Sequence, residues 1–418
     1  MSHLYLDTND RGIFSIQLFV RAGSVYENVK EHGWSHLLEH MMFKSKKHKP
    51  VKKLLFELAE LGGVFNAITN KDYTSFYIRT VDTNWKKAMK IIKHVVYEPN
   101  FIVTELESEK KVVTEEFLLY EDDIKDVVFD MAYNELLHVS NPYRKSVKGD
   151  LSTIKRALPS QLVEFHKNHY EKCMVFVSCS KQLKADVRKM AHSTFDQYLG
   201  KWETNIPSSQ LMASTASWPI VKVVNQPQRA QNVTIIMFQG MPYSDKDNIV
   251  LEFIWDVLTG SLNSLLMMEI REKRGLVYGI TAYNDAYATM GVTGIYFTSS
   301  SADTHKVIKY VLLILKRLMA KGLSENVLAF SKASYKNKLR YKLTEADFAD
   351  ERKMLRHYYG CSWTEDDVLR KLGRITNADV IRVCKKIFNV NRMCVVSVGK
   401  YTDSCRVKQQ ISKSVQVL

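Results

Sequence analysis

The order of strand-like and helical patterns is similar in the two halves of the chain, and this repetition constrains the fold more than any other feature. The first half opens on the alternating segment IFSIQLFVRAGS (13–24) and the second on IVKVVN (220–225). Each half closes on a β-rich run that follows an amphipathic helical pattern, namely HYEKCMVFVSCS (169–180) and VNRMCVVSVGK (390–400). Two similar successions of elements, each about 200 residues long, indicate an internal duplication.

The stretch between the two halves is polar and rich in turn-forming residues. It predicts a linker over residues 204–218, which separates an N-terminal domain (1–203) from a homologous C-terminal domain (219–418). The strand patterns do not alternate regularly with helices, as they would in a parallel doubly wound sheet. We therefore predict an α+β fold with two homologous domains, each a mostly antiparallel β-sheet packed with α-helices.

Composition limits the compartment and the partners. The six cysteines form no CxxC pair, so we expect reduced thiols and a reducing compartment such as the cytoplasm, with an organelle matrix as the alternative. Neither a secretory signal nor a transit peptide opens the sequence, and no apolar run reaches the roughly 18 residues of a membrane span. The net charge is +15, but the densest basic run, KSKKHKPVKK (44–53), lacks aromatic residues. A solvated basic surface is therefore favoured over nucleic-acid binding.

The segment GWSHLLEHMMF holds the first candidate site. A helix is expected to begin after Gly33, with Ser35 capping its first turn. On that helix His36 and His40 lie one turn apart, and Glu39 shares their face. Apolar residues cover the other sides, so the three polar side chains point into the interior, where a divalent ion would satisfy them. The alternative is a pair of core histidines with ordinary hydrogen-bond partners.

A second helical segment, VTELESEKKVVTEEFLLYEDD (103–123), supplies a third ligand. Glu109 and Glu116 lie seven residues apart on one largely apolar stripe, where carboxylates are costly unless they meet cations or donors. Glu115 is turned about 100° away and is expected to be solvated. An ordinary surface helix is the alternative, and it fits Glu116 poorly.

Two histidines and one carboxylate with an open fourth position are typical of catalytic zinc sites. We therefore predict that His36, His40 and Glu116 bind one Zn²⁺ per chain. Glu39 is predicted to be the general base that takes a proton from zinc-bound water, whose pKa zinc lowers to about 7. Because zinc also polarises a carbonyl, the predicted reaction is hydrolysis of an amide.

These motifs resemble those of the pitrilysin/insulinase family of zinc peptidases, in which HxxEH is followed about 76 residues later by Glu. Here His40 and Glu116 are separated by 76 positions (116 − 40). The resemblance extends over roughly residues 10–400 and implies that Glu109 supports the catalytic zinc site. The family pattern departs from this sequence at a short first strand, LYLDTND, and does not explain the tail after Gly399.

A further segment, LGGVFNAITNKDYTSFYI (61–78), resembles the strand at the edge of the family's active site. The resemblance implies that this edge strand pairs with extended substrate and that Asn66 and Ala67 contact it. From the residues alone, Asn66 is equally well explained as a turn residue.

In the second half, REKRGLVYG (271–279) resembles the family's Arg…Tyr motif. The resemblance implies that Arg271 and Tyr278 bind substrate and help to stabilise the oxyanion. We expect a helix to end at Gly275 and a strand to begin with LVYGI. The alternatives are an Arg at a helix end interacting with the helix dipole and a half-buried strand Tyr.

The resemblance implies a zinc-dependent endopeptidase that hydrolyses extended or unfolded peptides, with the two domains forming half of a clamshell chamber. A homodimer, or a heterodimer with a homologous subunit, would complete the chamber. One alternative is a non-catalytic structural or substrate-presenting subunit, and another is a nucleic-acid-associated protein that binds metal. Inactive subunits lose motif residues, whereas this chain keeps both histidines and both glutamates, so catalysis is favoured.

Overall fold

The computed structural model describes residues 3–46, 49–200, 218–229 and 231–418. The chain forms two compact units, Met1–Leu119 with Lys145–Pro207 and Tyr120–Arg144 with Ser208–Leu418. Apart from Trp218, the predicted linker 204–218 lies outside the described residues.

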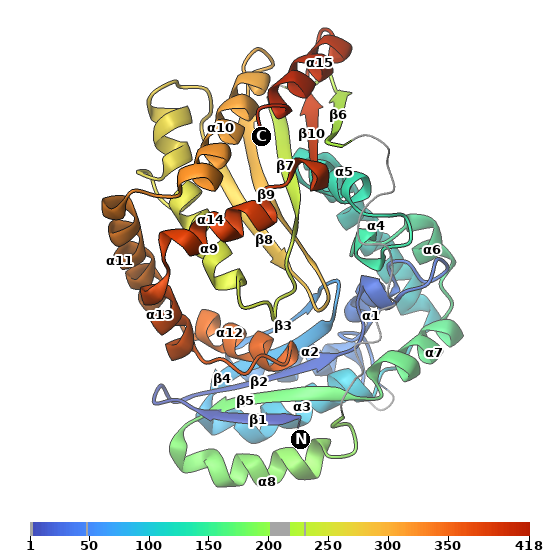
Figure 1. Cartoon of the computed structure of the whole chain (residues 1–418). Coiled ribbons are helices and arrows are strands. Elements are labelled where there is room, and N and C mark those ends of the chain that lie inside the picture. Colours follow the sequence, from blue (N-terminus) through green and yellow to red (C-terminus); the bar gives the residue numbers. More distant parts are fainter. Residues whose placement is uncertain (1–2, 47–48, 201–217, 230) are drawn as a thin grey trace. The chain divides into compact units, whose positions relative to one another are not determined.

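The first unit is built on a five-stranded mixed sheet (Figure 1). Its strands are β1 (Leu4–Thr8), β2 (Ile13–Val20), β3 (Val64–Thr69), β4 (Thr74–Val81) and β5 (Cys173–Cys179). They lie in the order β1-β5-β2-β4-β3, and among the described strands of this sheet only the β1–β5 pair is parallel. The central strands β2 and β5 are buried along nearly their whole length, whereas β3 lies at an edge and is partly exposed.

Seven helices belong wholly or mainly to the described part of the first unit. They are α1 (Trp34–Met41), α2 (Val51–Glu60), α3 (Trp85–Tyr97), α4 (Val103–Asp122), α6 (Leu151–Arg156), α7 (Pro159–Tyr170) and α8 (Lys184–Phe195). Helix α3 packs against β2 and β4, and α1 lies against β3. The apolar faces of these helices and of the sheet form one continuous core.

The second unit contains a sheet with the same topology. Its strands are β6 (Ile220–Asn225), β7 (Asn232–Gly240), β8 (Ile280–Ala286), β9 (Gly291–Ser299) and β10 (Met393–Gly399), in the order β6-β10-β7-β9-β8. Again one pair, β6–β10, is parallel and the other pairs are antiparallel. The predicted α+β fold, with two domains of one plan and mostly antiparallel pairing, is confirmed.

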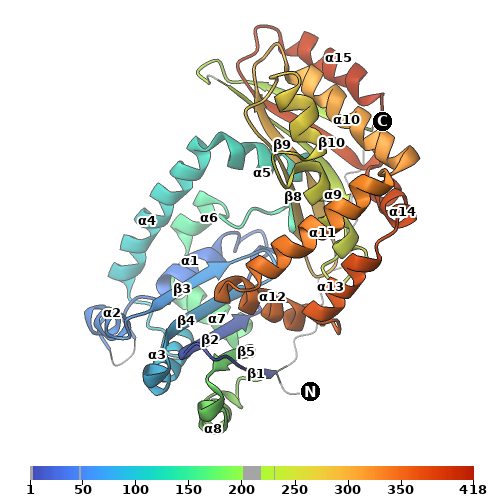
Figure 2. The same ribbon diagram turned by 90° about the vertical axis from the view of Figure 1, so that its left-hand side faces the viewer.

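The described helices of the second unit pack on this sheet or on one another. They are α5 (Ile124–Leu136), α9 (Asn248–Thr259), α10 (Thr304–Lys321), α11 (Glu325–Lys342), α12 (Ala346–Tyr358), α13 (Glu365–Arg374), α14 (Asn377–Ile387) and α15 (Ser404–Val415). The tail after Gly399 forms α15, which packs on α10 and β6 (Figure 2). No described helix is long and apolar enough to cross a membrane.

Helix α5 comes from the first half of the sequence but packs on β7 and β10 of the second sheet. Its buried face includes Ala132, whose carbonyl oxygen lies 3.5 Å from the Cys394 sulfur. The hydroxyl of Tyr133 donates to Asp285 at 2.9 Å and lies 2.7 Å from that of Tyr287. These contacts fix α5 as part of the second unit's core.

Candidate metal centre

Helix α1 positions the HLLEH residues, and its start is set by a close backbone contact. Gly33 has φ of 98°, and a Cβ there would lie 2.9 Å from the Cα of Gly149, so only glycine fits. The buried carboxylate of Glu27 accepts hydrogen bonds from the backbone N–H groups of Gly33 (2.8 Å) and Ser35 (2.7 Å). Our prediction that Ser35 caps the helix is therefore wrong: Gly33 occupies the N-cap position and Glu27 satisfies the first N–H groups.

Burial dominates the electrostatics of this cap. It raises the pKa of the Glu27 carboxyl to about 7, although the two backbone N–H groups and the nearby Lys145 act in the opposite direction. The Lys145 ammonium also donates to the backbone carbonyl of Glu27. A side chain from the preceding loop thus holds the N-terminus of α1, next to the predicted metal-binding residues.

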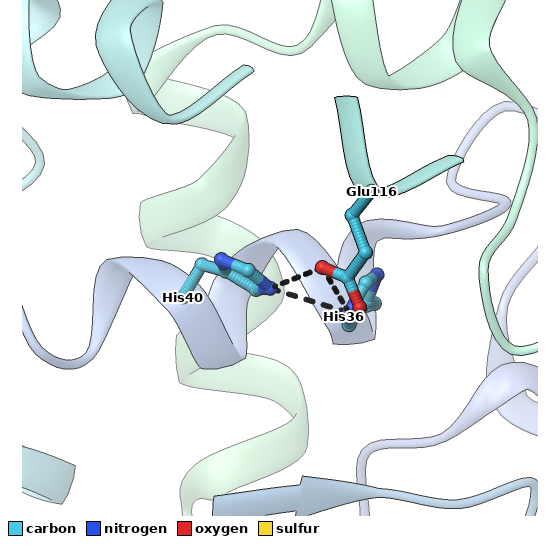
Figure 3. A group of neighbouring side chains, drawn as sticks. All are labelled: His36, His40 and Glu116. Carbon is cyan, nitrogen blue, oxygen red and sulfur yellow. Dashed lines mark hydrogen bonds and ion pairs between the residues drawn. The ribbon is translucent and has the colours of Figure 1, made fainter. Parts of the chain in front are cut away.

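The structure brings His36, His40 and Glu116 together (Figure 3). The Nε2 atoms of the two histidines are 3.2 Å apart, and Oε2 of Glu116 lies 3.3 Å from His40 Nε2 and 3.7 Å from His36 Nε2. Ligands at about 2.0–2.1 Å from a tetrahedral zinc ion are separated by roughly 3.3–3.4 Å. These three atoms therefore have the spacing that one zinc ion requires.

The donor set also fits a metal chemically. Burial, together with the neighbouring His40, lowers the pKa of His36 to about 4, so this imidazole is neutral at physiological pH. Zinc needs neutral imidazole with a free lone pair. A cation between the two Nε2 atoms and the carboxylate would satisfy all three at once.

A second carboxylate orients His40. The Nδ1 atom of His40 lies 3.0 Å from Oε1 of Glu109, which assigns the Nδ1 proton to that bond and leaves Nε2 free as a ligand. The Lys44 ammonium pairs with the other oxygen of Glu109. Burial opposes the charge of Glu109, but the hydrogen bonds from His40 and Lys44 outweigh it and lower the pKa of its carboxyl. Glu109 therefore stays ionised behind the histidine.

The third helical residue of the motif, Glu39, faces β3. Its Oε2 accepts a 2.5 Å hydrogen bond from the hydroxyl of Thr69, the last residue of β3. Burial raises the pKa of Glu39, and the bond from Thr69 counteracts part of that rise. Glu39 belongs to the same constellation but is not among the three converging ligand atoms.

Sequence reasoning missed Glu27, Lys44 and Thr69. The available signal was their position: Lys44 directly follows the segment GWSHLLEHMMF, and Thr69 lies three residues after Asn66 in the segment that resembles an edge strand. Nothing in the sequence connected Glu27 with the helix, because the contact depends on how the loop before α1 folds back.

Strand β3 is an edge strand, as the resemblance implied, and its outer edge pairs with no described strand. Val64 and Ile68 are large apolar residues that are 56% and 48% exposed on it. Asn66 is exposed and its side-chain oxygen accepts the N–H of Ala67, which is buried. The strand thus offers backbone groups and apolar side chains to solvent.

Arg271 and Tyr278 both belong to the second unit, whereas every residue of the metal group belongs to the first. Arg271 lies on a π-helical segment, Met267–Glu272, with its guanidinium 5.3 Å from the centre of the Tyr278 ring. Gly275 follows the helix with φ of 60°. The strand was expected to begin with LVYGI, but β8 begins only at Ile280, the last residue of that run. Tyr278 therefore precedes the strand, and it is 83% exposed rather than a half-buried strand residue.

Comparison with known proteins agrees with these features. Residues 5–147 match the model of insulinase (peptidase family M16), and residues 158–335 match that of the peptidase M16 inactive domain. An uncharacterised zinc protease of Rickettsia felis is 24% identical over 379 residues, which are 90% of each chain. One from Bacillus subtilis is 23% identical over 376 residues, again 90% of each chain.

Two solved structures have a similar fold. A peptidase M16 inactive domain from Pseudomonas fluorescens has a TM-score of 0.82 at 19% identity, covering 96% of both chains. A protease from Helicobacter pylori has a TM-score of 0.84 at 18% identity, covering 95% of this chain and 96% of that one. With two adjoining M16 matches over most of its length and zinc proteases among its relatives, the chain belongs to the insulinase family of M16 peptidases.

Proposed function

We propose that this chain is a zinc-dependent endopeptidase that hydrolyses extended or unfolded peptides. The observation that carries the proposal is the convergence of His36 Nε2, His40 Nε2 and Glu116 Oε2, with Glu39 beside them. Zinc held by these atoms would supply a Lewis acid that polarises the scissile carbonyl and acidifies the attacking water. The zinc proteases among the relatives support the choice of metal.

Glu39 is the proposed general base and, later in the cycle, the proposed acid. It takes a proton from the attacking water and returns a proton to the leaving amine. A carboxyl whose pKa is raised by burial is a stronger base than an exposed one, and the hydrogen bond from Thr69 fixes its direction. Glu109 keeps His40 in the tautomer that has its lone pair on Nε2.

The substrate is proposed to add to β3 as an extra strand. The outer edge of β3, which pairs with no strand in the described part of the chain, favours an extended peptide, whose backbone would bond to the strand beside Asn66 and Ala67. Arg271 and Tyr278 are proposed to bind the peptide and stabilise the oxyanion, a role suited to a guanidinium and a phenol. Pairing with a second, homologous subunit stays a prediction.

The test is the variant Glu39→Gln, assayed for zinc content and for cleavage of a random peptide library by mass spectrometry. Loss of the base should lower turnover about 100- to 10,000-fold while one zinc ion stays bound. Normal turnover by the variant would refute the assigned base. A zinc-loaded wild-type protein that cleaves no peptide would instead favour the non-catalytic subunit.

A further inference from the structure

Helices α10 and α15 lie side by side on the second unit, as Figures 1 and 2 both show. The Ser414 hydroxyl of α15 donates to the carbonyl of His305 on α10 (3.3 Å), and the Lys316 ammonium donates to the carbonyl of Val417 (2.9 Å). Together the two helices expose eight cationic side chains, which we call the α10–α15 basic surface. These are Lys306, Lys309, Lys316, Arg317, Lys321, Arg406, Lys408 and Lys413.

This surface is more purely basic than the chain as a whole. The full sequence has 45 acidic residues against 60 lysines and arginines, yet Thr304–Lys321 and Ser404–Val415 contain no Asp or Glu. Among the described residues, Lys306 is the one member of the set that forms an ion pair, with Asp303 at 2.9 Å. Most of the positive charge on these helices is therefore uncompensated.

The buried sides of both helices determine how the surface can bind. Val311 and Leu315 of α10 and Ile411 of α15 are buried in the unit's core, so these apolar faces cannot insert elsewhere. On α10 the exposed residues form one stripe along the helix, about 22 Å from Lys306 to Lys321. Its exposed apolar member, Leu313, is 40% exposed between the cations. The binding chemistry offered is electrostatic, over a broad two-helix face.

We propose that the α10–α15 basic surface binds the headgroups of a membrane that contains anionic lipid. Clusters of lysine and arginine on a helical face are attracted to such membranes without sequence or shape requirements on the partner. The exposed Leu313 suits a lipid interface, where an apolar side chain can enter between headgroups.

Nucleic acid is the competing polyanion, and the surface suits it less well. Proteins that bind single strands stack the bases on aromatic side chains, and none of the exposed residues of α10 and α15 is aromatic. A helix that reads duplex DNA enters the major groove, but α10 is flanked by α14 and α15, which pack against it. A planar membrane does not require a protruding helix.

Cosedimentation with lipid vesicles tests the proposal on the full chain. The wild type should sediment with vesicles of phosphatidylcholine mixed with phosphatidylserine, not with pure phosphatidylcholine, and added salt should release it. The variant Lys309→Gln, Arg317→Gln, Arg406→Gln, Lys408→Gln should bind the mixed vesicles at least about 100-fold more weakly. Its thermal unfolding, followed by circular dichroism, should match that of the wild type.

A matched control removes four exposed charges from the packed helix pair α3 and α8 of the first unit. The variant Lys90→Gln, Lys184→Gln, Arg188→Gln, Lys189→Gln should retain vesicle binding, because these cations are outside the proposed surface. Equal loss in both variants would overturn the proposal in favour of net charge alone. Absence of binding to the mixed vesicles, or displacement from them by duplex DNA at equal phosphate concentration, would overturn it as well.

Discussion

His40 is held at both nitrogens of its ring. Nδ1 bonds to Glu109, which in turn pairs with Lys44, and Nε2 faces His36 and Glu116. A carboxylate behind a ligating histidine fixes both the ring orientation and the tautomer. The chain Lys44–Glu109–His40 therefore fixes the ring with Nε2 towards the other two ligand atoms. Burial opposes the charge of His40, but the Glu109 bond and the nearby carboxylates outweigh it and raise the pKa of the ring.

The choice of Glu116 over its neighbour can be tested directly. Glu116→Gln should lose bound zinc, because an amide is a poor ligand where a carboxylate oxygen is needed. Glu115→Gln is the control, since Glu115 is exposed and lies outside the converging group. Zinc content is measured by atomic emission after gel filtration. Equal zinc in the two proteins would contradict the assignment.

Thr69 is predicted to matter through its hydroxyl alone. Thr69→Val keeps the shape of the side chain but removes the bond to Glu39, so kcat should fall roughly tenfold while zinc content is unchanged. Thr69→Ser restores the hydroxyl and should recover most of the rate. If serine and valine lower kcat equally, the methyl contact rather than the hydrogen bond is responsible.

At the residue scale the sequence predicted which three side chains converge, but not the residues that support them. His36 and His40 are one helical turn apart, and the stripe bearing Glu116 is visible in the periodicity, so local geometry was enough to nominate them. Thr69 and Glu27 are different, because each contact joins segments whose approach depends on the tertiary fold. Glu109 was predicted from its position on the helical stripe and from the family resemblance, and the structure shows its bond to His40.

At the scale of elements, α1 depends on a side chain that is not part of it. The buried Glu27 carboxylate satisfies two N–H groups at the start of the helix. Its pKa, raised by burial from 4.5 to about 7, means that the folded protein binds this proton more tightly than the unfolded chain does. The stabilisation of the folded protein by this proton is fully present below about pH 4.5 and is lost as the pH rises through about 7.

The corresponding prediction concerns stability against pH. Between about pH 4.5 and 7 the wild type's free energy of unfolding should fall by about 3 kcal/mol more than that of Glu27→Gln, which has no proton to lose. Urea unfolding at several pH values measures both proteins, and the difference cancels other titrating groups. A wild-type slope that equals the variant's, or that rises with pH relative to it, would contradict the prediction.

Most elements follow from their local patterns, and the exceptions have physical causes. The closing strands were predicted at 169–180 and 390–400, and β5 and β10 lie within those ranges. Strand β8 begins later than expected because its register is set by pairing with β9, where Ile280 lies opposite Phe297. The apolar residues of LVYGI do not indicate at which residue the pairing with β9 begins.

At the scale of the whole molecule, the sequence predicts two domains with the same order of elements. It does not predict that α5, from the first half of the sequence, packs in the second unit. The sequence places α5 in the first half, and only packing shows that it covers β7 and β10. Its apolar face would suit either sheet, so periodicity cannot choose between them. The sequence therefore suggests two consecutive domains, while the compact units are interleaved.

Interleaving predicts how fragments behave. Residues 219–418 alone should lack cooperative thermal unfolding, because removal of α5 exposes the faces of β7 and β10 that Val128, Ala132 and Leu136 cover. Joining residues 120–144 to 208–418 through a Gly/Ser linker should restore a cooperative transition in calorimetry. If 219–418 unfolds cooperatively without that segment, α5 is dispensable for the second unit.

The position of α5 also has a consequence for how the sequence can change over time. Ala132 lies against Cys394, although 262 positions separate them along the chain. Ala132 is fully buried on α5, which packs on β7 and β10, so a larger residue at position 132 should be accompanied by smaller ones on those strands. The two halves of this gene, however far they diverge elsewhere, are thus obliged to evolve together along that contact.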